Sequence, residues 1–168
     1  MLINELQNIK LIVFDFDGVF TDNRVLVNEN GVESVFCWRS DGLGLEKIKK
    51  IGIKIAIISS EKNNLVQVRA SKLGIYCKNN INNKKDELIK TAKYFNVDLK
   101  DTIFVGNDIN DIPAFKIAGI AIGVNDCNDH ARLYTNFCLN TKGGYGAVRE
   151  ICEMLEEANN QKQTIGDN

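Results

Sequence analysis

The chain alternates short apolar runs with longer amphipathic stretches, and this alternation predicts its secondary structure. Continuous apolar runs rich in β-branched residues are typical of strands buried on both faces. The predicted strands are Leu11–Phe14, Lys54–Ile58, Ile75–Cys77, Thr102–Val105, Gly119–Val124 and Phe137–Leu139. The predicted helices are Gly42–Lys50, Asn63–Leu73, Lys84–Phe95, Asn110–Ala118 and Tyr145–Ala158. Strand–helix alternation of this kind predicts an α/β fold, a Rossmann-like parallel sheet with helices on both faces.

One segment departs from the alternation. Val25–Val27 and Val32–Phe36 flank the sequence Asn-Glu-Asn-Gly, and Asn-Gly between alternating apolar residues predicts a β-hairpin. We expect a single domain over residues 1–158, with this hairpin as an insertion at about 24–37. Residues 159–168 are polar and end in Gly-Asp-Asn, and we expect them to form a disordered tail.

Composition narrows the class of protein. A net charge of −1 argues against a nucleic-acid backbone as the partner. The chain has neither a long apolar run nor a basic-then-apolar leader, so we expect no membrane span and no signal peptide. The five cysteines are odd in number and form no Cys-x-x-Cys pair. We therefore expect reduced thiols, mostly in the core, in a cytoplasmic protein.

The first candidate catalytic motif directly follows the first predicted strand. Residues 14–22 spell Phe-Asp-Phe-Asp-Gly-Val-Phe-Thr-Asp, with Asp15 and Asp17 two positions apart. Alternate residues of an extended chain point the same way, so the two carboxylates can address one reaction volume. Open α/β sheets place their sites beyond the carboxyl ends of the strands. The pattern also fits an ordinary strand followed by an Asp/Gly turn.

Three further polar elements follow later strands. Ser59 can donate a hydrogen bond to a phosphate oxygen, or it can serve as a helix N-cap. Lys84 opens a predicted helix, where it is either a site residue or a solvated surface charge. The sequence Gly-Asn-Asp-Ile-Asn-Asp at 106–111 is either a turn with a start like a capping box or a divalent-metal site.

Taken in order, Asp-x-Asp-Gly, then Ser, Lys and Gly-Asn-Asp-x-x-Asp resemble the haloacid dehalogenase superfamily of phosphatases over about residues 10–157. The resemblance implies that Asp15 is the nucleophile, forming an aspartyl-phosphate, and that Asp17 is the general acid and base. It also implies that Ser59 and Lys84 hold the phosphoryl oxygens. Mg²⁺ would be bound by the Asp15 carboxylate, the Asp17 carbonyl and the Asn107 side chain. Asn107 stands where the family has Asp, so metal affinity can be lower, with Asp108 or Asp111 compensating.

The segments around the motifs leave no room for a cap domain, so a HAD-like, capless fold is expected. The Arg39–Gly42 stretch and the glycine-rich segment Gly143–Glu150 resemble the capless sugar-acid phosphatases, the subfamily of 3-deoxy-D-manno-octulosonate 8-phosphate phosphatase. That resemblance implies a homotetramer formed through the hairpins, in which neighbouring subunits cover the active site. The alternative is a hairpin folded back on its own core.

Within this subfamily the segment from Ser59 to Lys72 is similar to enzymes acting on nonulosonate 9-phosphates, with octulosonate 8-phosphates as the other candidates. Glu61, Arg69 and Lys72 would bind the substrate. Arg69 and Lys72 share a helix face, and an arginine fork suits a carboxylate. Glu61 could instead complement a helix N-terminus, with both cations solvated.

The leading interpretation is a Mg²⁺-dependent phosphatase that acts on a small phosphorylated keto-sugar acid of sialic-acid or lipopolysaccharide biosynthesis. A second is a catalytically weak oligomerisation module, similar to domains fused to sialic-acid cytidylyltransferases, some of which also have Asn in the fourth motif. A third is a capless phosphatase acting on a protein or nucleic acid, which predicts a monomer.

Overall fold

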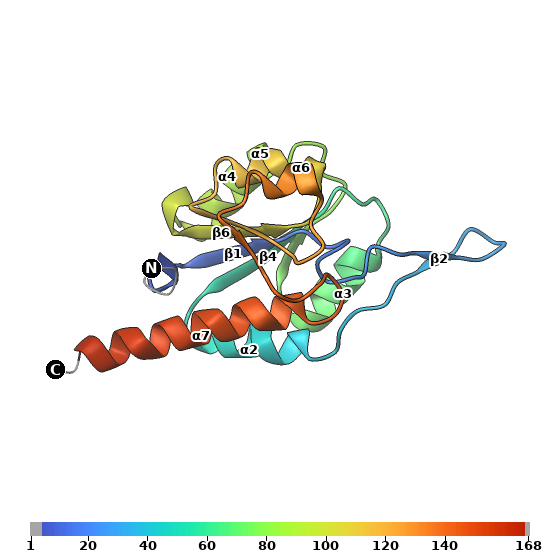
Figure 1. The fold of residues 1–168 in the computed structure, drawn as a ribbon. Coiled ribbons are helices and arrows are strands. Elements are labelled where there is room, and N and C mark those ends of the chain that lie inside the picture. The colour runs from blue at the N-terminus through green and yellow to red at the C-terminus, as the bar shows by residue number, and fades with distance from the viewer. Residues whose placement is uncertain (1–4, 167–168) are drawn as a thin grey trace.

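The computed structural model describes residues 5–166, with side chains up to Lys162 (Figure 1). Its main feature is a six-stranded sheet in the order β5-β4-β1-β6-β7-β8, in which all neighbouring strands pair in parallel. The strands of this sheet are β1 Leu11–Phe14, β4 Lys54–Ile58, β5 Tyr76–Lys78, β6 Thr102–Gly106, β7 Ile120–Gly123 and β8 Phe137–Cys138. The predicted α/β class and parallel sheet are confirmed.

Helices cover both faces of the sheet. The α-helices are α2 Asp41–Lys50, α3 Leu65–Leu73, α4 Lys84–Phe95, α5 Ile112–Phe115, α6 Asp129–Arg132 and α7 Ala147–Gly166. Two 3₁₀ turns, η1 Leu99–Asp101 and η2 Ile109–Asp111, flank β6. Helices α2, α3 and α7 lie on one face, and α4, α5 and α6 lie on the other (Figure 1). The predicted helix at Asn110–Ala118 is thus a 3₁₀ turn followed by a short α5.

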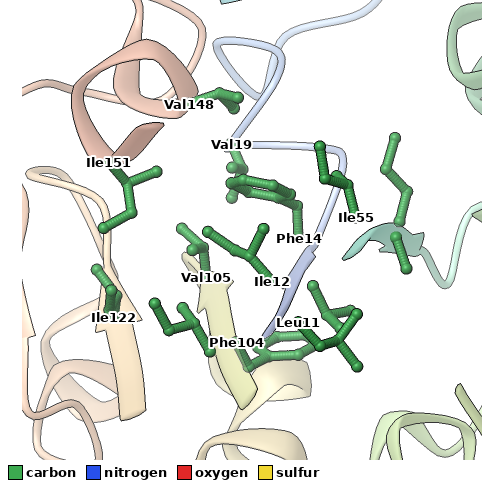
Figure 2. Packing of buried hydrophobic residues seen from close by; sticks show 14 of the residues in the cluster. Leu11, Ile12, Phe14, Val19, Ile55, Phe104, Val105, Ile122, Val148 and Ile151 are labelled. Carbon is green, nitrogen blue, oxygen red and sulfur yellow. The ribbon is translucent and has the colours of Figure 1, made fainter. Parts of the chain in front are cut away.

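The core sits around β1, whose four residues have no exposed surface. Alternation along the strand sends side chains to both helical layers. Figure 2 shows Ile12 and Phe14 on the side of the sheet that faces Val148 and Ile151 of α7. Because β1 lies between β4 and β6, and polar residues directly follow each of these strands, the sheet brings three predicted motifs to one edge.

The hairpin consists of β2 Leu26–Val27 and β3 Glu33–Ser34, which pair antiparallel. It extends away from the sheet rather than folding back on the core (Figure 1). Its apolar side chains are open to solvent: Leu26 is 67% exposed and Phe36 is 78% exposed. Between the described strands, the chain inserts this hairpin and single helices but no separate cap domain.

The structure corrects the prediction of a disordered tail from Asn159. Helix α7 continues to Gly166, since no proline or glycine interrupts residues 159–165. Lys162 of this extension donates hydrogen bonds to Gln7 O (3.1 Å) and Asn8 Oδ1 (3.2 Å). Contact with the start of the chain therefore supports a helix that composition alone did not predict. Residues 167 and 168 lie outside the described part.

Two further findings bear on the class of protein. All five cysteines are free thiols, as predicted, and two of them, Cys127 and Cys152, are buried. Among residues 5–166, none of the helices combines the length and the apolar character that a membrane span needs.

Asp41 at the start of α2 is fully buried, and it makes stability depend on pH. Its Oδ1 accepts a hydrogen bond from Arg149 N (3.2 Å), while its Oδ2 has no partner in the described part of the chain. Burial raises the pKa of Asp41 to about 7. The native state therefore holds this proton more tightly than the unfolded chain, and stability is lost as pH rises from about 4 through 7.

We expect Asp41→Asn to relieve that loss, because an amide keeps the Oδ1 acceptor without the charge. The free energy of unfolding of the variant, minus that of the wild type, should rise by about 2 kcal/mol between pH 5 and pH 8. Urea denaturation of both proteins at the two pH values measures this difference. An equal difference at both values would show that Asp41 does not titrate on unfolding.

Candidate active site

A cavity of about 220 Å³ lies at the carboxyl edge of the sheet. It is lined by the residues that follow β1, β4 and β6: Asp15, Asp17, Asn23, Ser59, Ser60, Glu61, Asn107, Asp108 and Asn110. Five of these were predicted as site residues, and the parallel sheet brings them together across almost a hundred positions of sequence. Hydroxyl, amide and carboxylate groups therefore face one volume, and such groups can bind an anion through hydrogen bonds or coordinate a metal ion.

Lys84 lies beneath the cavity, between two buried carboxylates. Its Nζ is 2.8 Å from Asp15 Oδ2 and 2.6 Å from Asp111 Oδ1. The lysine side chain is 1% exposed, so it is not a solvated surface charge. Asn83 caps α4 by accepting hydrogen bonds from Lys85 N and Asp86 N, and this fixes the first turn of α4, to which Lys84 belongs. Two of the three ammonium hydrogens are engaged, and a third donor remains.

The environment of Asp15 makes its negative charge costly. Asp15 is only 4% exposed, and burial, followed by repulsion from Asp111, raises its pKa to about 7 despite the opposing effect of Lys84. Its Oδ1 accepts a hydrogen bond from Phe16 N (2.7 Å), which fixes the carboxylate plane. A further positive charge at this carboxylate would offset the desolvation and favour its ionised form.

Asp17 lines the cavity, and its surroundings favour the protonated form of its carboxyl group. Burial, followed by the nearby Glu61 carboxylate, raises the pKa of Asp17. The Thr21 hydroxyl donates a long hydrogen bond to Asp17 Oδ1 (3.4 Å) and partly opposes this shift. A raised pKa keeps a carboxyl group protonated closer to neutral pH, as a general acid requires.

Ser59 is buried and faces the cavity, and it does not cap a helix. Its backbone N donates to Lys78 O of β5 (2.9 Å), and its Oγ accepts from Glu61 N (3.1 Å). Helix α3 begins later, after Asn64. With its acceptor side used by the loop, the Ser59 hydroxyl hydrogen is available to an oxygen atom in the cavity.

The residues around Asn107 fit a hard divalent cation. The Asn107 side chain is nearly buried, and its Oδ1 has no hydrogen-bond partner within the described residues. Its amide lies against Gly18, where a Cβ would come within 2.0 Å of Nδ2. Two carboxylates and amide or main-chain oxygens suit Mg²⁺, although the described residues contain no cluster of three or more His, Cys, Asp or Glu placed to hold a metal.

Gly18→Ala should disrupt this arrangement. The backbone at Gly18 has φ +80°, and the added methyl group would displace the Asn107 amide. We expect the Mg²⁺ concentration for half-maximal activity to rise by about tenfold or more. Gly52→Ala is the matched control, because Gly52 has φ +87° but nothing within 4 Å of an added Cβ. If both variants need the same Mg²⁺ concentration, Asn107 does not contribute to metal binding.

Asp111 has a structural role that the sequence indicated only in part. Its Oδ2 accepts hydrogen bonds from Asn107 N (2.8 Å) and Asp108 N (3.2 Å), while its Oδ1 binds Lys84. Together with Asp108 it forms a capping box at η2, which confirms one of the two predicted alternatives. Both Asp111 oxygens are therefore occupied by the protein. Asp108, in contrast, lines the cavity.

The three predicted substrate contacts are not brought together within one chain. Glu61 lines the cavity. Arg69 lies farther along α3, where its guanidinium donates a long hydrogen bond to Trp38 O (3.4 Å). Its Nε is buried and has no hydrogen-bond partner among the residues that the structure describes. Lys72 is exposed and lines neither this cavity nor a second one that adjoins it between the hairpin and α3. The direction of α3 carries both cations away from the reaction volume of their own chain, so their contact with substrate stays a prediction.

Comparison with known proteins agrees with this geometry. Residues 43–119 match the family model of haloacid dehalogenase-like hydrolases. The 3-deoxy-D-manno-octulosonate 8-phosphate phosphatase KdsC of Haemophilus influenzae is 30% identical over 156 residues, which cover 92% of this chain and 86% of that protein. Its Escherichia coli counterpart is 29% identical over 155 residues, covering 92% and 82%.

Solved structures of similarly named phosphatases also resemble this chain over most of its length. The phosphatase of this name from Moraxella catarrhalis, in complex with magnesium, phosphate and KDO, superposes with a TM-score of 0.91 at 31% identity, covering 98% of this chain and 95% of that one. A cobalt-bound form of the H. influenzae phosphatase gives a TM-score of 0.89 at 28% identity, covering 95% and 94%. The similarity thus extends over the whole sheet and the site at its edge.

Proposed function

Because the chain belongs to the haloacid dehalogenase-like hydrolases, and within them to the 3-deoxy-D-manno-octulosonate 8-phosphate phosphatase family, we propose that it hydrolyses the phosphomonoester of a keto-sugar acid. The observation that carries this proposal is the buried Asp15–Lys84–Asp111 arrangement directly below a cavity lined by Asp17, Ser59 and Asn107.

The proposed reaction begins with attack of an Asp15 oxygen on phosphorus. The new O–P bond forms as the bond to the sugar oxygen breaks, and Asp17 donates its proton to that leaving oxygen. Asp17, now ionised, then takes a proton from the water that attacks the aspartyl-phosphate. This second step releases inorganic phosphate and restores the Asp15 carboxylate.

Electrostatics explains why cationic groups surround the nucleophile. Two like charges about 4 Å apart repel by roughly 4 kcal/mol at an effective dielectric constant near 20. Lys84, held by Asp15 and Asp111, offsets part of this repulsion when a phosphate enters. Asp15, the Asp17 carbonyl and Asn107 would hold Mg²⁺, which when bound would supply further positive charge at the nucleophile.

Two substrates remain candidates. The names of the relatives support an octulosonate 8-phosphate. The Glu61 carboxylate in the cavity, together with the similarity of the Ser59–Lys72 segment to enzymes of nine-carbon acids, supports a nonulosonate 9-phosphate. The intact Asp15 and Lys84, and relatives that are named phosphatases, support an enzyme over the oligomerisation module predicted as an alternative.

The decisive experiment measures phosphate release from both acid phosphates, with Mg²⁺ and with EDTA. We expect turnover of at least one of them with Mg²⁺ and its loss with EDTA. No release from either compound, with release from a phosphoprotein or nucleotide instead, would overturn the assigned substrate class.

A homotetramer is part of the same proposal. The exposed hairpin side chains and the cavity open to solvent support an assembly in which a neighbouring subunit covers the site and brings Arg69 and Lys72 to it. Light scattering should then give the mass of four chains, whereas a monomer would contradict this part of the proposal. Cytoplasmic localisation stays a prediction.

A further inference from the structure

A second cavity, of about 210 Å³, adjoins the catalytic one. The two share Asp17, Asn23 and Glu61 as lining residues, so a molecule bound at Asp17 can extend from one into the other. The second cavity lies between the base of the hairpin and the start of α3 and contains Glu33 and Asn63. Nothing in the proposed reaction steps uses this space.

Two carboxylates in this cavity are each fixed through one oxygen atom. Glu61 Oε1 accepts hydrogen bonds from Lys62 N (2.6 Å) and Asn63 N (2.9 Å). Glu33 Oε2 accepts one from Asn63 Nδ2 (3.0 Å). Asn63 is itself held, since its Oδ1 accepts from Leu65 N (3.1 Å). The other oxygen of each carboxylate accepts no hydrogen bond from the residues that the structure describes.

These free acceptors determine the chemistry that the cavity suits. Hydroxyl groups can donate to both carboxylates at once, and the apolar wall of Phe16, Val25, Val35, Leu65 and Val66 can pack against the C–H groups between them.

A second anion is disfavoured in the same space. Asp17, Glu33 and Glu61 supply three carboxylates against one guanidinium, that of Arg24, and Asp22 already binds this group at 2.7 Å. An added carboxylate would therefore meet mostly negative charge.

We propose that this second cavity binds the hydroxylated carbon chain next to the phosphate, with Glu33 and Glu61 as acceptors, and that the substrate's carboxylate points away from it. This inference rests on the proposed function and adds Glu33 and Asn63 as specificity-determining residues. Because Asn63 joins the hairpin strand to the loop before α3, the hairpin becomes part of the leaving-group site.

Glu33→Ala tests the assignment, with Glu157→Ala as the control. Glu157 is an exposed glutamate of α7, outside the hairpin and both cavities. For Glu33→Ala, kcat/KM for octulosonate 8-phosphate should fall at least tenfold more than kcat/KM for methyl phosphate, which has no hydroxylated chain. Glu157→Ala should change neither value. Equal losses on both substrates, or no loss on either, would overturn the proposal.

Calorimetry keeps this test separate from the proposed function, because binding can be measured even if no phosphomonoester is hydrolysed. Glu33→Ala should weaken binding of free 3-deoxy-D-manno-octulosonate at least fivefold more than binding of inorganic phosphate. If the free sugar acid binds wild type and variant equally, the second cavity does not hold the hydroxylated chain, whatever the enzyme's activity.

Discussion

Asp15→Asn is expected to reduce phosphate release by at least about a thousandfold while leaving the protein at least as stable as the wild type. The amide is nearly isosteric with the carboxylate, but it cannot act as the nucleophile. Lys84 keeps its contact with Asp111 at 2.6 Å, so no buried charge is left without a partner. The substitution also removes a carboxylate whose pKa is raised to about 7 by burial and by Asp111.

The stability part of this prediction has a definite direction with pH. A carboxylate with a raised folded-state pKa loses stability as pH rises from about 4 through 7, and the amide does not. The variant should therefore melt at the same temperature as the wild type or higher at pH 8. Functional residues often cost stability in this way.

Single-turnover phosphate release and thermal melts at pH 8 measure the two effects. Asp98→Asn is the control, because Asp98 is 75% exposed, makes only a 3.7 Å ion pair with Lys100 and lies outside both cavities. Asp98→Asn should be as active as the wild type. Substantial turnover by Asp15→Asn, above about a tenth of the wild-type rate, would show that Asp15 is not the nucleophile.

Lys84→Met is expected to be the most destabilising of the substitutions considered, with a loss of about 3–5 kcal/mol at neutral pH. Methionine fills similar space, but Asp15 and Asp111 would face each other in the interior without a cation. Activity should be lost as well. The destabilisation should shrink at pH 5, because burial and Asp111 already raise the pKa of Asp15 to about 7, and protonation of Asp15 removes the repulsion.

A second variant separates charge from packing. If the loss comes from uncompensated carboxylates, the Asp15→Asn/Lys84→Met double variant should regain much of the stability, as urea denaturation would measure. A double variant as unstable as Lys84→Met alone would assign the loss to packing of the methionine. Lys90→Met is the control, since Lys90 is 73% exposed and makes only a 3.7 Å contact with Glu87.

Local patterns were sufficient for much of the fold. The predicted bounds of β1, β4 and α4 agree with the structure at both ends, because a continuous apolar run or a capped amphipathic stretch identifies these elements locally. The predicted ends were less accurate where contacts with residues distant in sequence determine the end of a helix. Helix α7 extends past Ala158 and contacts Gln7. The helix predicted at Asn110–Ala118 is shorter and consists of η2 and α5.

The same division holds for the site. The sequence by itself predicted that Asp15, Asp17, Ser59 and Asn107 lie together, since each comes at or just after the end of a strand and a parallel sheet gathers such positions at one edge. The residue type alone left Lys84 open between a site residue and a surface charge, because a lysine's burial depends on partners far away in the chain, and the family resemblance assigned it to the site. Its contacts with Asp15 and Asp111, 69 and 27 positions away, exclude the surface role.

Only the tertiary structure placed Glu33 and Asn63 beside the catalytic cavity and directed Arg69 away from it. Spacing along a strand or helix determines which way a side chain points within its own element. Its contacts with other elements depend on how the hairpin and α3 pack against the sheet. That packing depends on the shape and charge of the whole molecule.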